Sequence, residues 1–182
     1  MTADLAPSRG PATSWLAVER SRVLGQLSAA ADARVVTLSA TAGFGKSTIL
    51  AQWSARWRDE RAGDVVRLEV TEGADSRELA DRLAAALSGE PTELSPALLP
   101  PAYDEPTWHA ATLPALRSLL AADRAPLLIV IDDAMNLTDA LAPSLLEAVL
   151  TTLPAGSQLA IGTRDVTPYP ARRLRSSGRS SG

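Results

Sequence analysis

One lysine stands out among the basic residues of this chain. Of its 182 residues, 18 are Lys or Arg, and seventeen of these are Arg; the single Lys is Lys46. It lies between Gly45 and Ser47, and Gly43 precedes it by three positions. Glycines without Cβ atoms let successive backbone N–H groups curve around a phosphate, where a lysine ammonium can reach the β and γ phosphates. Residues 40–48 therefore predict a phosphate-binding loop.

The segments on either side of this loop are the ones that such a loop needs. Residues 34–39 are apolar and β-branched without alternation, which predicts a strand buried on both faces. Residues 47–58 follow with helical spacing, so the loop would join a strand to the anion-attracting N-terminus of a helix. Ser47 would then be placed to bind Mg²⁺. Ala40 stands where the strict motif has its first glycine, and we expect this small residue to preserve the turn.

Two aspartates follow a strongly apolar segment. Residues 127–131 predict a buried strand, and Asp132 and Asp133 come directly after it. By itself, such a pair is more often the start of a solvated loop. In a chain with a phosphate-binding loop, a carboxylate at the end of a neighbouring strand holds the water shell of Mg²⁺. We expect Asp132 on the metal side and Asp133 to orient or deprotonate the attacking water.

An arginine ends a further predicted strand. Residues 159–163 are apolar, and Arg164 follows them. If this strand lies beside the phosphate-binding loop, the guanidinium of Arg164 can contact the γ-phosphate and report its presence. The alternative is an arginine that is solvated at the end of a strand.

The remaining patterns complete an alternation of strands and helices. Residues 65–70 alternate in polarity, which predicts a strand near a sheet edge. Further helices are predicted over 21–33, 75–87, 108–122 and 144–153. This order favours a parallel, doubly wound α/β sheet with helices on both faces, a three-layer P-loop NTPase fold. We expect a flexible leader over 1–14, one domain over 15–175 and a disordered tail over 176–182.

Composition excludes several function classes. The chain has no Cys and one His, which excludes disulfides and thiol catalysis and leaves little support for histidine-rich metal sites. It has no apolar run of membrane-spanning length and no signal-peptide pattern, so we expect a cytoplasmic protein without membrane contact. Residues 164–182 carry five Arg and one Asp, which leaves a net charge of −7 for residues 1–163. A protein segment with a net charge of −7 binds DNA poorly, because both carry negative charge, so no direct DNA binding is expected.

Several segments of the sequence resemble those of a known family. Residues 39–53 are similar to the nucleotide-binding segment of STAND-class P-loop ATPases, in particular the bacterial maltose-regulator-like and large LuxR-family transcriptional activators. The likeness continues in residues 18–24, 131–133, 159–164 and 168–174, and spans about residues 16–175. It implies ATP or ADP as the ligand with Mg²⁺, slow hydrolysis, and a nucleotide-controlled switch between monomer and assembly. Partners would be a second copy or a regulatory protein.

The resemblance also assigns roles to single residues. Phosphates and Mg²⁺ would be bound by Ala42, Gly43, Phe44, Gly45, Lys46, Ser47 and Thr48. Asp132 and Asp133 would form the Walker B pair, with Asp132 on the metal, and Arg164 would be the sensor. Val18 and Arg20 would lie near the base. Lys46, Asp133 and Arg164 are the predicted catalytic residues.

The sequence departs from the family pattern at several positions. Thr41 stands where the family usually has Pro, and Ser47 stands where it usually has Thr. Ala134-Met135 occupies the place of an aromatic–His pair that couples hydrolysis to signalling in the family. Such ATPases also have a further strand beside the phosphate-loop strand and lid helices over the nucleotide. Only four strands are predicted here, so the chain resembles the first half to two-thirds of an NTPase module, with the phosphate-loop strand at a sheet edge.

Three functions remain open at this point. The leading prediction is an ATP-binding regulatory NTPase domain that hydrolyses ATP slowly or not at all when isolated. A small P-loop phosphotransferase is the alternative from the enzyme class, and it requires an acceptor pocket. A truncated, non-catalytic nucleotide-binding remnant is the third.

Overall fold

The computed structural model describes residues 21–164, except for residues 31, 42, 90–103 and 123–124. Val18, Arg20 and Ala42, together with the expected leader and tail, lie outside the described residues. None of the helices in the described part is long and apolar enough to cross a membrane.

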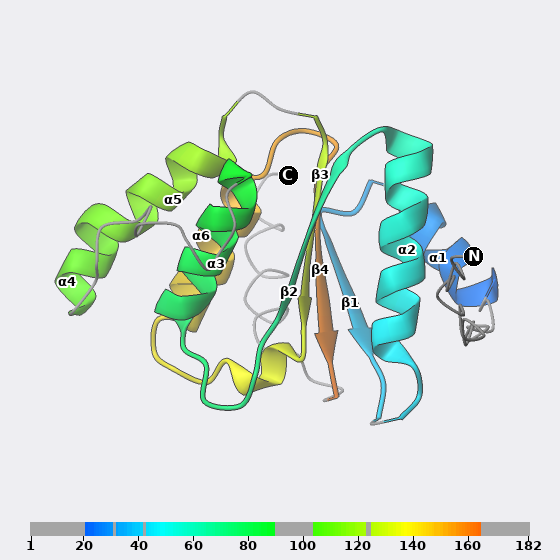
Figure 1. Ribbon diagram of the computed structural model, residues 1–182, viewed down its shortest axis with the longest axis horizontal. Helices are drawn as coiled ribbons and strands as arrows, with labels where there is room; N and C mark the ends of the chain where they lie inside the picture. Colours follow the sequence, from blue (N-terminus) through cyan, green and yellow to red (C-terminus); the bar gives the residue numbers. More distant parts are fainter. Residues whose placement is uncertain (1–20, 31, 42, 90–103, 123–124, 165–182) are drawn as a thin grey trace, which may run out of the picture.

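Four parallel strands form one sheet, in the order β1-β4-β3-β2. The strands are β1 (Val35–Ser39), β2 (Asp64–Glu69), β3 (Leu127–Asp132) and β4 (Gln158–Thr163). Because every neighbouring pair is parallel, all four strands end at the same edge of the sheet (Figure 1). In register, Ser39 lies beside Thr163, and Glu69 beside Asp132. The predicted parallel α/β sheet is confirmed.

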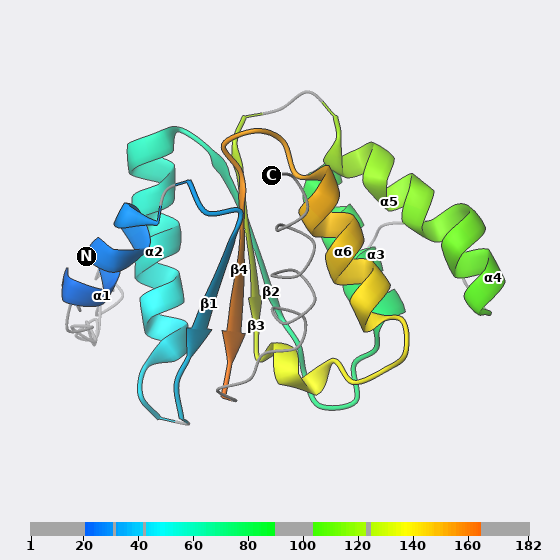
Figure 2. The same ribbon diagram turned by 180° about the vertical axis from the view of Figure 1, so that it is seen from behind.

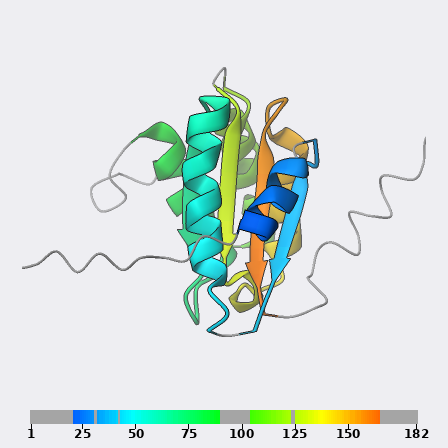
Figure 3. The ribbon, with the colours of Figure 1, turned by 90° about the vertical axis from the view of Figure 1, so that its right-hand side faces the viewer.

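Helices cover both faces of this sheet. One face carries α1 (Ser21–Ala29) and α2 (Lys46–Arg61). The other carries α3 (Ser76–Ser88), α5 (Leu113–Leu120) and α6 (Ala142–Thr152), as Figures 1 and 2 show from opposite sides. In Figure 3, α2 runs along the direction of the strands with α1 beside it. The predicted three-layer arrangement is therefore confirmed.

The helix boundaries follow from local sequence signals. Asp75 caps α3, because its Oδ1 accepts hydrogen bonds from the backbone N–H groups of Arg77 and Glu78. Pro143 lies in the first turn of α6, where its missing N–H is not needed. Gly89 ends α3 in the left-handed region, with φ of 71°.

Two predicted helices differ in extent from the observed ones. The helix predicted over 21–33 is shorter, because α1 ends at Ala29. The segment predicted as one helix over 108–122 consists of α4 (Glu105–Thr107), a π-helical turn (Trp108–Thr112) and α5. Pro114 lies in the first turn of α5, so it marks the start of that helix. A short 3₁₀ helix, Ala134–Asn136, follows β3.

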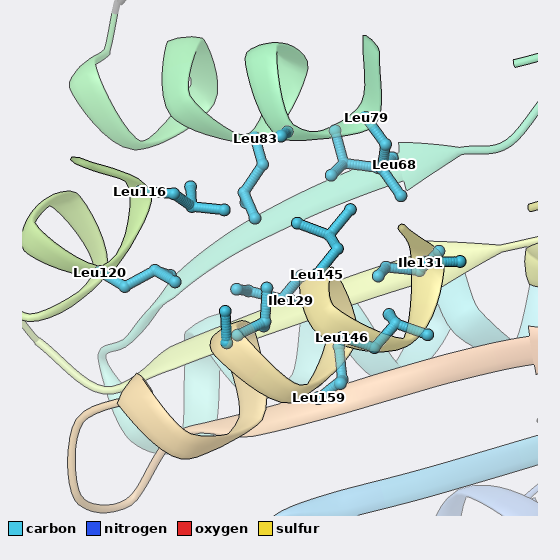
Figure 4. Close-up of a cluster of buried hydrophobic side chains, with 14 of the residues drawn as sticks. Leu68, Leu79, Leu83, Leu116, Leu120, Ile129, Ile131, Leu145, Leu146 and Leu159 are labelled. Atoms are coloured by element: carbon cyan, nitrogen blue, oxygen red, sulfur yellow. The ribbon is translucent and has the colours of Figure 1, made fainter. Parts of the chain in front are cut away.

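Apolar side chains fill the space on both faces of the sheet. On the side of α3, α5 and α6, leucines and isoleucines interdigitate around Ile129 and Ile131 of β3 (Figure 4). Trp108 is fully buried there, and its Nε1 donates a 2.9 Å hydrogen bond to Ser144 Oγ. On the other side, Trp53 and Trp57 of α2 are buried against the sheet.

The two outer strands of the described sheet differ from the inner pair. Every residue of β3 and β4 is buried, whereas the apolar residues of β1 are only half-buried. The sequence predicted that residues 34–39 are buried on both faces, and the structure shows less burial than that. The reason is that β4 is the only strand that pairs with β1 in the described part of the chain. The alternating strand β2 lies at the opposite edge, as its pattern predicted.

Candidate functional site

The loop between β1 and α2 has the backbone that a phosphate-binding turn requires. Gly43 and Gly45 have φ of 82° and 75°, in the left-handed region that a side chain disfavours. Ala40 donates its backbone N–H to Thr163 O at 3.1 Å, which extends the pairing of β1 with β4 into the loop. Helix α2 then begins at Lys46, so its unpaired N-terminal N–H groups lie at the loop.

A pocket lies at this end of the sheet. It has a volume of about 270 Å³ and is lined by Ala40, Thr41, Gly43, Gly45, Lys46, Ser47, Thr48, Asp133 and Arg164. Sites for small molecules usually have volumes of about 300–1,000 Å³. The pocket is thus slightly smaller than a typical small-molecule site. Phe44 is not part of the lining, and 61% of its surface is exposed.

Lys46 forms ion pairs with both aspartates at the end of β3. Its Nζ lies 2.8 Å from Asp132 Oδ1 and also hydrogen-bonds Asp133 Oδ1. Lys46 and Asp132 are buried, with 7% and 6% of their surfaces exposed. Burial lowers the pKa of Lys46, but the hydrogen bonds and charges of the two aspartates outweigh it, so that the pKa stands above its ordinary value. The ammonium is therefore kept protonated inside the protein.

Asp132 lies beneath the pocket and is held from several sides. Its Oδ1 accepts the backbone N–H of Asp133 at 2.9 Å, and the Ser47 hydroxyl also hydrogen-bonds its carboxylate. Burial raises the pKa of Asp132, but the hydrogen bonds from Lys46 and Ser47 and the charge of Lys46 outweigh it, so that the pKa is below its ordinary value. A carboxylate and a hydroxyl in contact are the pair that a phosphate-bound Mg²⁺ needs.

Gly162 gives Asp132 the space for this position, and sequence reasoning did not single it out. A Cβ built on Gly162 of β4 would lie 2.5 Å from Asp132 Oδ1 and 3.0 Å from Leu50 Cδ1. Real Cβ atoms essentially never approach a heavy atom so closely. A glycine inside an apolar strand is itself a signal of close approach, so the run 159–163 contained a usable clue.

Asp133 faces the pocket from an unusual backbone conformation. Its φ and ψ are 51° and 39°, in the left-handed region that Asp adopts more readily than most residues. Its Oδ2 lies 3.7 Å from Nη2 of Arg164, whose side chain is 55% exposed. The carboxylate of Asp133 thus lies between the cations of Lys46 and Arg164.

The donor set fits a magnesium ion that is shared with a ligand. In the part of the chain that the structure describes, no three His, Cys, Asp or Glu residues gather as a metal site. Mg²⁺ usually keeps several waters and binds through one or two carboxylates together with substrate phosphates. Asp132 with Ser47 meets that requirement once phosphates are present.

Comparison with protein families identifies the domain. A family model described as an AAA domain matches residues 30–163, well over half of the chain. The chain belongs to the AAA domain family. The match includes the phosphate-binding loop, Lys46 and both aspartates, so this is an AAA-type P-loop ATPase domain.

A solved structure has a similar fold. A chain in the structure of Drosophila ORC bound to DNA is similar to this protein, with a TM-score of 0.55 and 15% sequence identity. The alignment covers 84% of this protein and 28% of the ORC chain. C. elegans PCH-2 has a TM-score of 0.47 and 15% identity, with 85% of this chain and 40% of that one covered. The chain thus spans less than a third of the length of the ORC chain, and the likeness shows the fold alone. No curated protein matches it.

The structure brings together most of the predicted site residues of the AAA domain. Seven predicted site residues line one pocket, namely Gly43, Gly45, Lys46, Ser47, Thr48, Asp133 and Arg164, and Asp132 contacts Lys46 of that lining. Phe44 lies outside the pocket. The predicted neighbours of the base, Val18 and Arg20, and the loop residue Ala42 are outside the described residues.

Proposed function

We propose that this AAA domain binds ATP or ADP with Mg²⁺ and acts as a nucleotide-controlled regulatory module. The observation that carries the proposal is the placement of Lys46. The only lysine of the chain is buried at the first turn of a helix, beside two left-handed glycines and in a pocket of about 270 Å³. The helix N-terminus, the backbone amides and the ammonium together favour an anion at this point.

The contacts support a role for each residue of the proposed site. The loop amides of residues 42–48 and Lys46 would hold the β and γ phosphates. Ser47 and Asp132, which already hydrogen-bond each other, would hold Mg²⁺ through its oxygen ligands or water shell. Asp133 would orient the attacking water, and Arg164, with its exposed guanidinium at the pocket wall, would contact the γ-phosphate.

The regulatory part of the proposal rests on the sequence. Residues 39–53 and 159–164 resemble those of STAND-type bacterial transcriptional regulators, in which ATP controls assembly. On that basis we assign slow hydrolysis to the isolated domain, self-association or a regulatory protein as the partner, residues 15–175 as the extent of the domain, and the cytoplasm as its location. A domain without a nucleotide-dependent change in assembly state would contradict this part.

The binding proposal can be tested with one variant and a charge-matched control. Lys46→Ala should weaken binding of a fluorescent ATP analogue with Mg²⁺ by roughly thirty- to a hundredfold, because losing a hydrogen bond to a charged group costs about 2–3 kcal/mol. Arg58→Ala removes the same charge from the exposed end of the same helix and should leave binding unchanged. Equal binding by the wild type and Lys46→Ala would refute the proposed site.

The single lysine also permits a direct observation. Labelling of lysine with ¹⁵N at Nζ gives one side-chain resonance in this protein, since Lys46 is its only lysine. That resonance should shift when ADP and Mg²⁺ are added, because the ammonium exchanges aspartate partners for phosphate oxygens. An unchanged resonance at saturating nucleotide would place the phosphates elsewhere. Turnover that requires a small-molecule acceptor would instead favour a phosphotransferase.

A further inference from the structure

The two aspartates after β3 differ in where they lie relative to the pocket. Asp133 lines the pocket, whereas Asp132 lies beneath it, against Gly162. Both carboxylates nevertheless contact the same ammonium, that of Lys46. A phosphate that enters the pocket therefore meets the carboxylate of Asp133 before that of Asp132.

The charges of this cluster already balance without a ligand. Lys46 and Arg164 contribute two positive charges, and Asp132 and Asp133 two negative ones. Phosphate groups would add negative charge at the position where Asp133 now contacts both cations. Like charges in a partly buried site repel strongly, so a phosphate and the Asp133 carboxylate cannot both stay on Lys46.

The structure also indicates which aspartate can leave. Asp132 is held by Lys46, by Ser47 and by the backbone N–H of Asp133, and its side chain is 8% exposed. The Asp133 side chain is 18% exposed. Apart from Lys46, its carboxylate is paired with the half-exposed Arg164, whose Nη2 lies 3.7 Å from Asp133 Oδ2. A pair as open as Asp133 with Arg164 contributes little stability, so rotation of this side chain away from Lys46 is the easier change.

We propose that Asp133 is a built-in competitor for phosphate, whose carboxylate occupies Lys46 and Arg164 until a divalent cation accompanies the nucleotide. This inference rests on the proposed nucleotide site and deepens it. The cation supplies the positive charge that lets both the phosphates and the displaced carboxylate remain near the site. A nucleotide without a divalent cation must displace the Asp133 carboxylate without the positive charge of the cation to offset the repulsion. The site therefore binds the nucleotide–metal complex more tightly than the free nucleotide.

The test measures ADP affinity with and without Mg²⁺. ADP is the probe because it has no γ-phosphate to hydrolyse, so a role of Asp133 in hydrolysis does not affect the result. In EDTA, Asp133→Asn should bind ADP about tenfold more tightly than the wild type, because a carboxylate no longer competes for the two cations. With Mg²⁺ the difference should shrink to about twofold or less. Calorimetry or fluorescence anisotropy gives both values.

A matched control and a second variant keep the result interpretable. Asp59→Asn removes the same charge from an exposed position on α2 and should behave as the wild type in both buffers. Asn tolerates the left-handed backbone of Asp133; if Asp133→Asn still fails to fold, Asp133→Gly provides the same test, because glycine adopts that conformation freely.

The outcomes separate this inference from the proposed function. If the wild type binds Mg²⁺–ADP, Lys46→Ala does not, and Asp133→Asn binds ADP in EDTA no better than the wild type, the competitor role is wrong and the site stands. An equal gain in Asp59→Asn would also overturn the role, since it would show a general charge effect. If the wild type binds no nucleotide with Mg²⁺, the proposed function fails, and this inference fails with it.

Discussion

The two ends of the sheet use polar side chains in different ways. At the amino end, where the strands begin, polar side chains bond to backbone carbonyls. Gln158 Nε2 donates to the carbonyls of Ala30 and Ala33, each at 2.7 Å, and Arg34 donates to the carbonyls of Leu150 and Leu153 at 2.9 and 2.7 Å. At the carboxyl end, the charged side chains of Lys46, Asp132, Asp133 and Arg164 bond to one another.

This difference separates stability from binding. The carbonyls at the amino end lie at the end of helix α6 and just after the end of helix α1, where helical N–H groups run out, and the side chains supply partners for them; the Ala30 carbonyl also accepts the backbone N–H of Ala33. The ion pairs at the carboxyl end can be exchanged for a ligand, because each charged group can accept a phosphate or a metal ion in place of its present partner. The amino end therefore fixes the fold, and the carboxyl end stays exchangeable.

The largest effect is expected at the carboxyl end, from Gly162→Ala. The added Cβ would overlap Asp132 Oδ1, so the carboxylate or β4 must move, and we expect a loss of roughly 3 kcal/mol in the free energy of unfolding. Because Asp132 is displaced, the Mg²⁺ dependence of ADP binding should weaken as well. Urea denaturation and ADP titration measure the two quantities.

A glycine elsewhere provides the control for that substitution. Gly25 of helix α1 has open space around its Cβ position, so Gly25→Ala should stabilise the protein by about 0.5–1 kcal/mol. A fully stable Gly162→Ala protein with unchanged Mg²⁺ dependence would show that Asp132 does not need its observed position.

An intermediate effect is expected at the amino end, from Gln158→Leu. This change removes the side-chain donor to the carbonyls of Ala30 and Ala33, of which the Ala30 carbonyl keeps the backbone N–H of Ala33, and should lower the free energy of unfolding by about 2 kcal/mol. Affinity for Mg²⁺–ADP should stay within about twofold of the wild type, since Gln158 lies at the opposite end of β4 from the pocket. Gln26→Leu, at an exposed position of α1, is the control. Parallel losses of stability and affinity would break the distinction between the two ends.

The smallest effect is expected from Arg34→Ala. Its guanidinium contacts the last carbonyls of α6 from an exposed position, so water can replace part of the interaction. We expect a loss of about 1 kcal/mol in the free energy of unfolding and no change in ADP affinity. Arg22→Ala, which removes an exposed arginine of α1, should change neither quantity. An effect on binding larger than that on stability would show that Arg34 communicates with the pocket.

Local sequence signals predicted most of the fold. The buried strand 127–131, the cap at Asp75 and the helix start at Pro143 depend on neighbours in the sequence, and the structure has all three. The degree of burial of residues 34–39 was predicted wrongly, because burial of a strand depends on how many strands pair with it, and the order of strands in a sheet is not a local property. The π-helical turn at Trp108 was missed for a similar reason, since that side chain is fixed by packing and by Ser144 of another helix.

The candidate site divides in the same way. The residue types at Gly43, Gly45, Lys46 and Asp132 follow from the motif, because a phosphate loop and its metal carboxylate have strong chemical requirements. The need for Gly162 appeared only when β4 was found between β1 and β3, which brings its backbone against the Asp132 carboxylate.

By itself, then, the sequence determined that this chain has a strand, a glycine loop, one lysine at a helix start, and an acidic strand end, since each of these is a property of neighbouring residues. Only the tertiary structure decided that Lys46 is shared by both aspartates, that Asp133 lines the pocket while Asp132 lies beneath it, and that Arg164 reaches the same carboxylate. The physical reason is that ion pairing depends on distances across the sheet between residues far apart in the chain, and those distances are set by strand order and register.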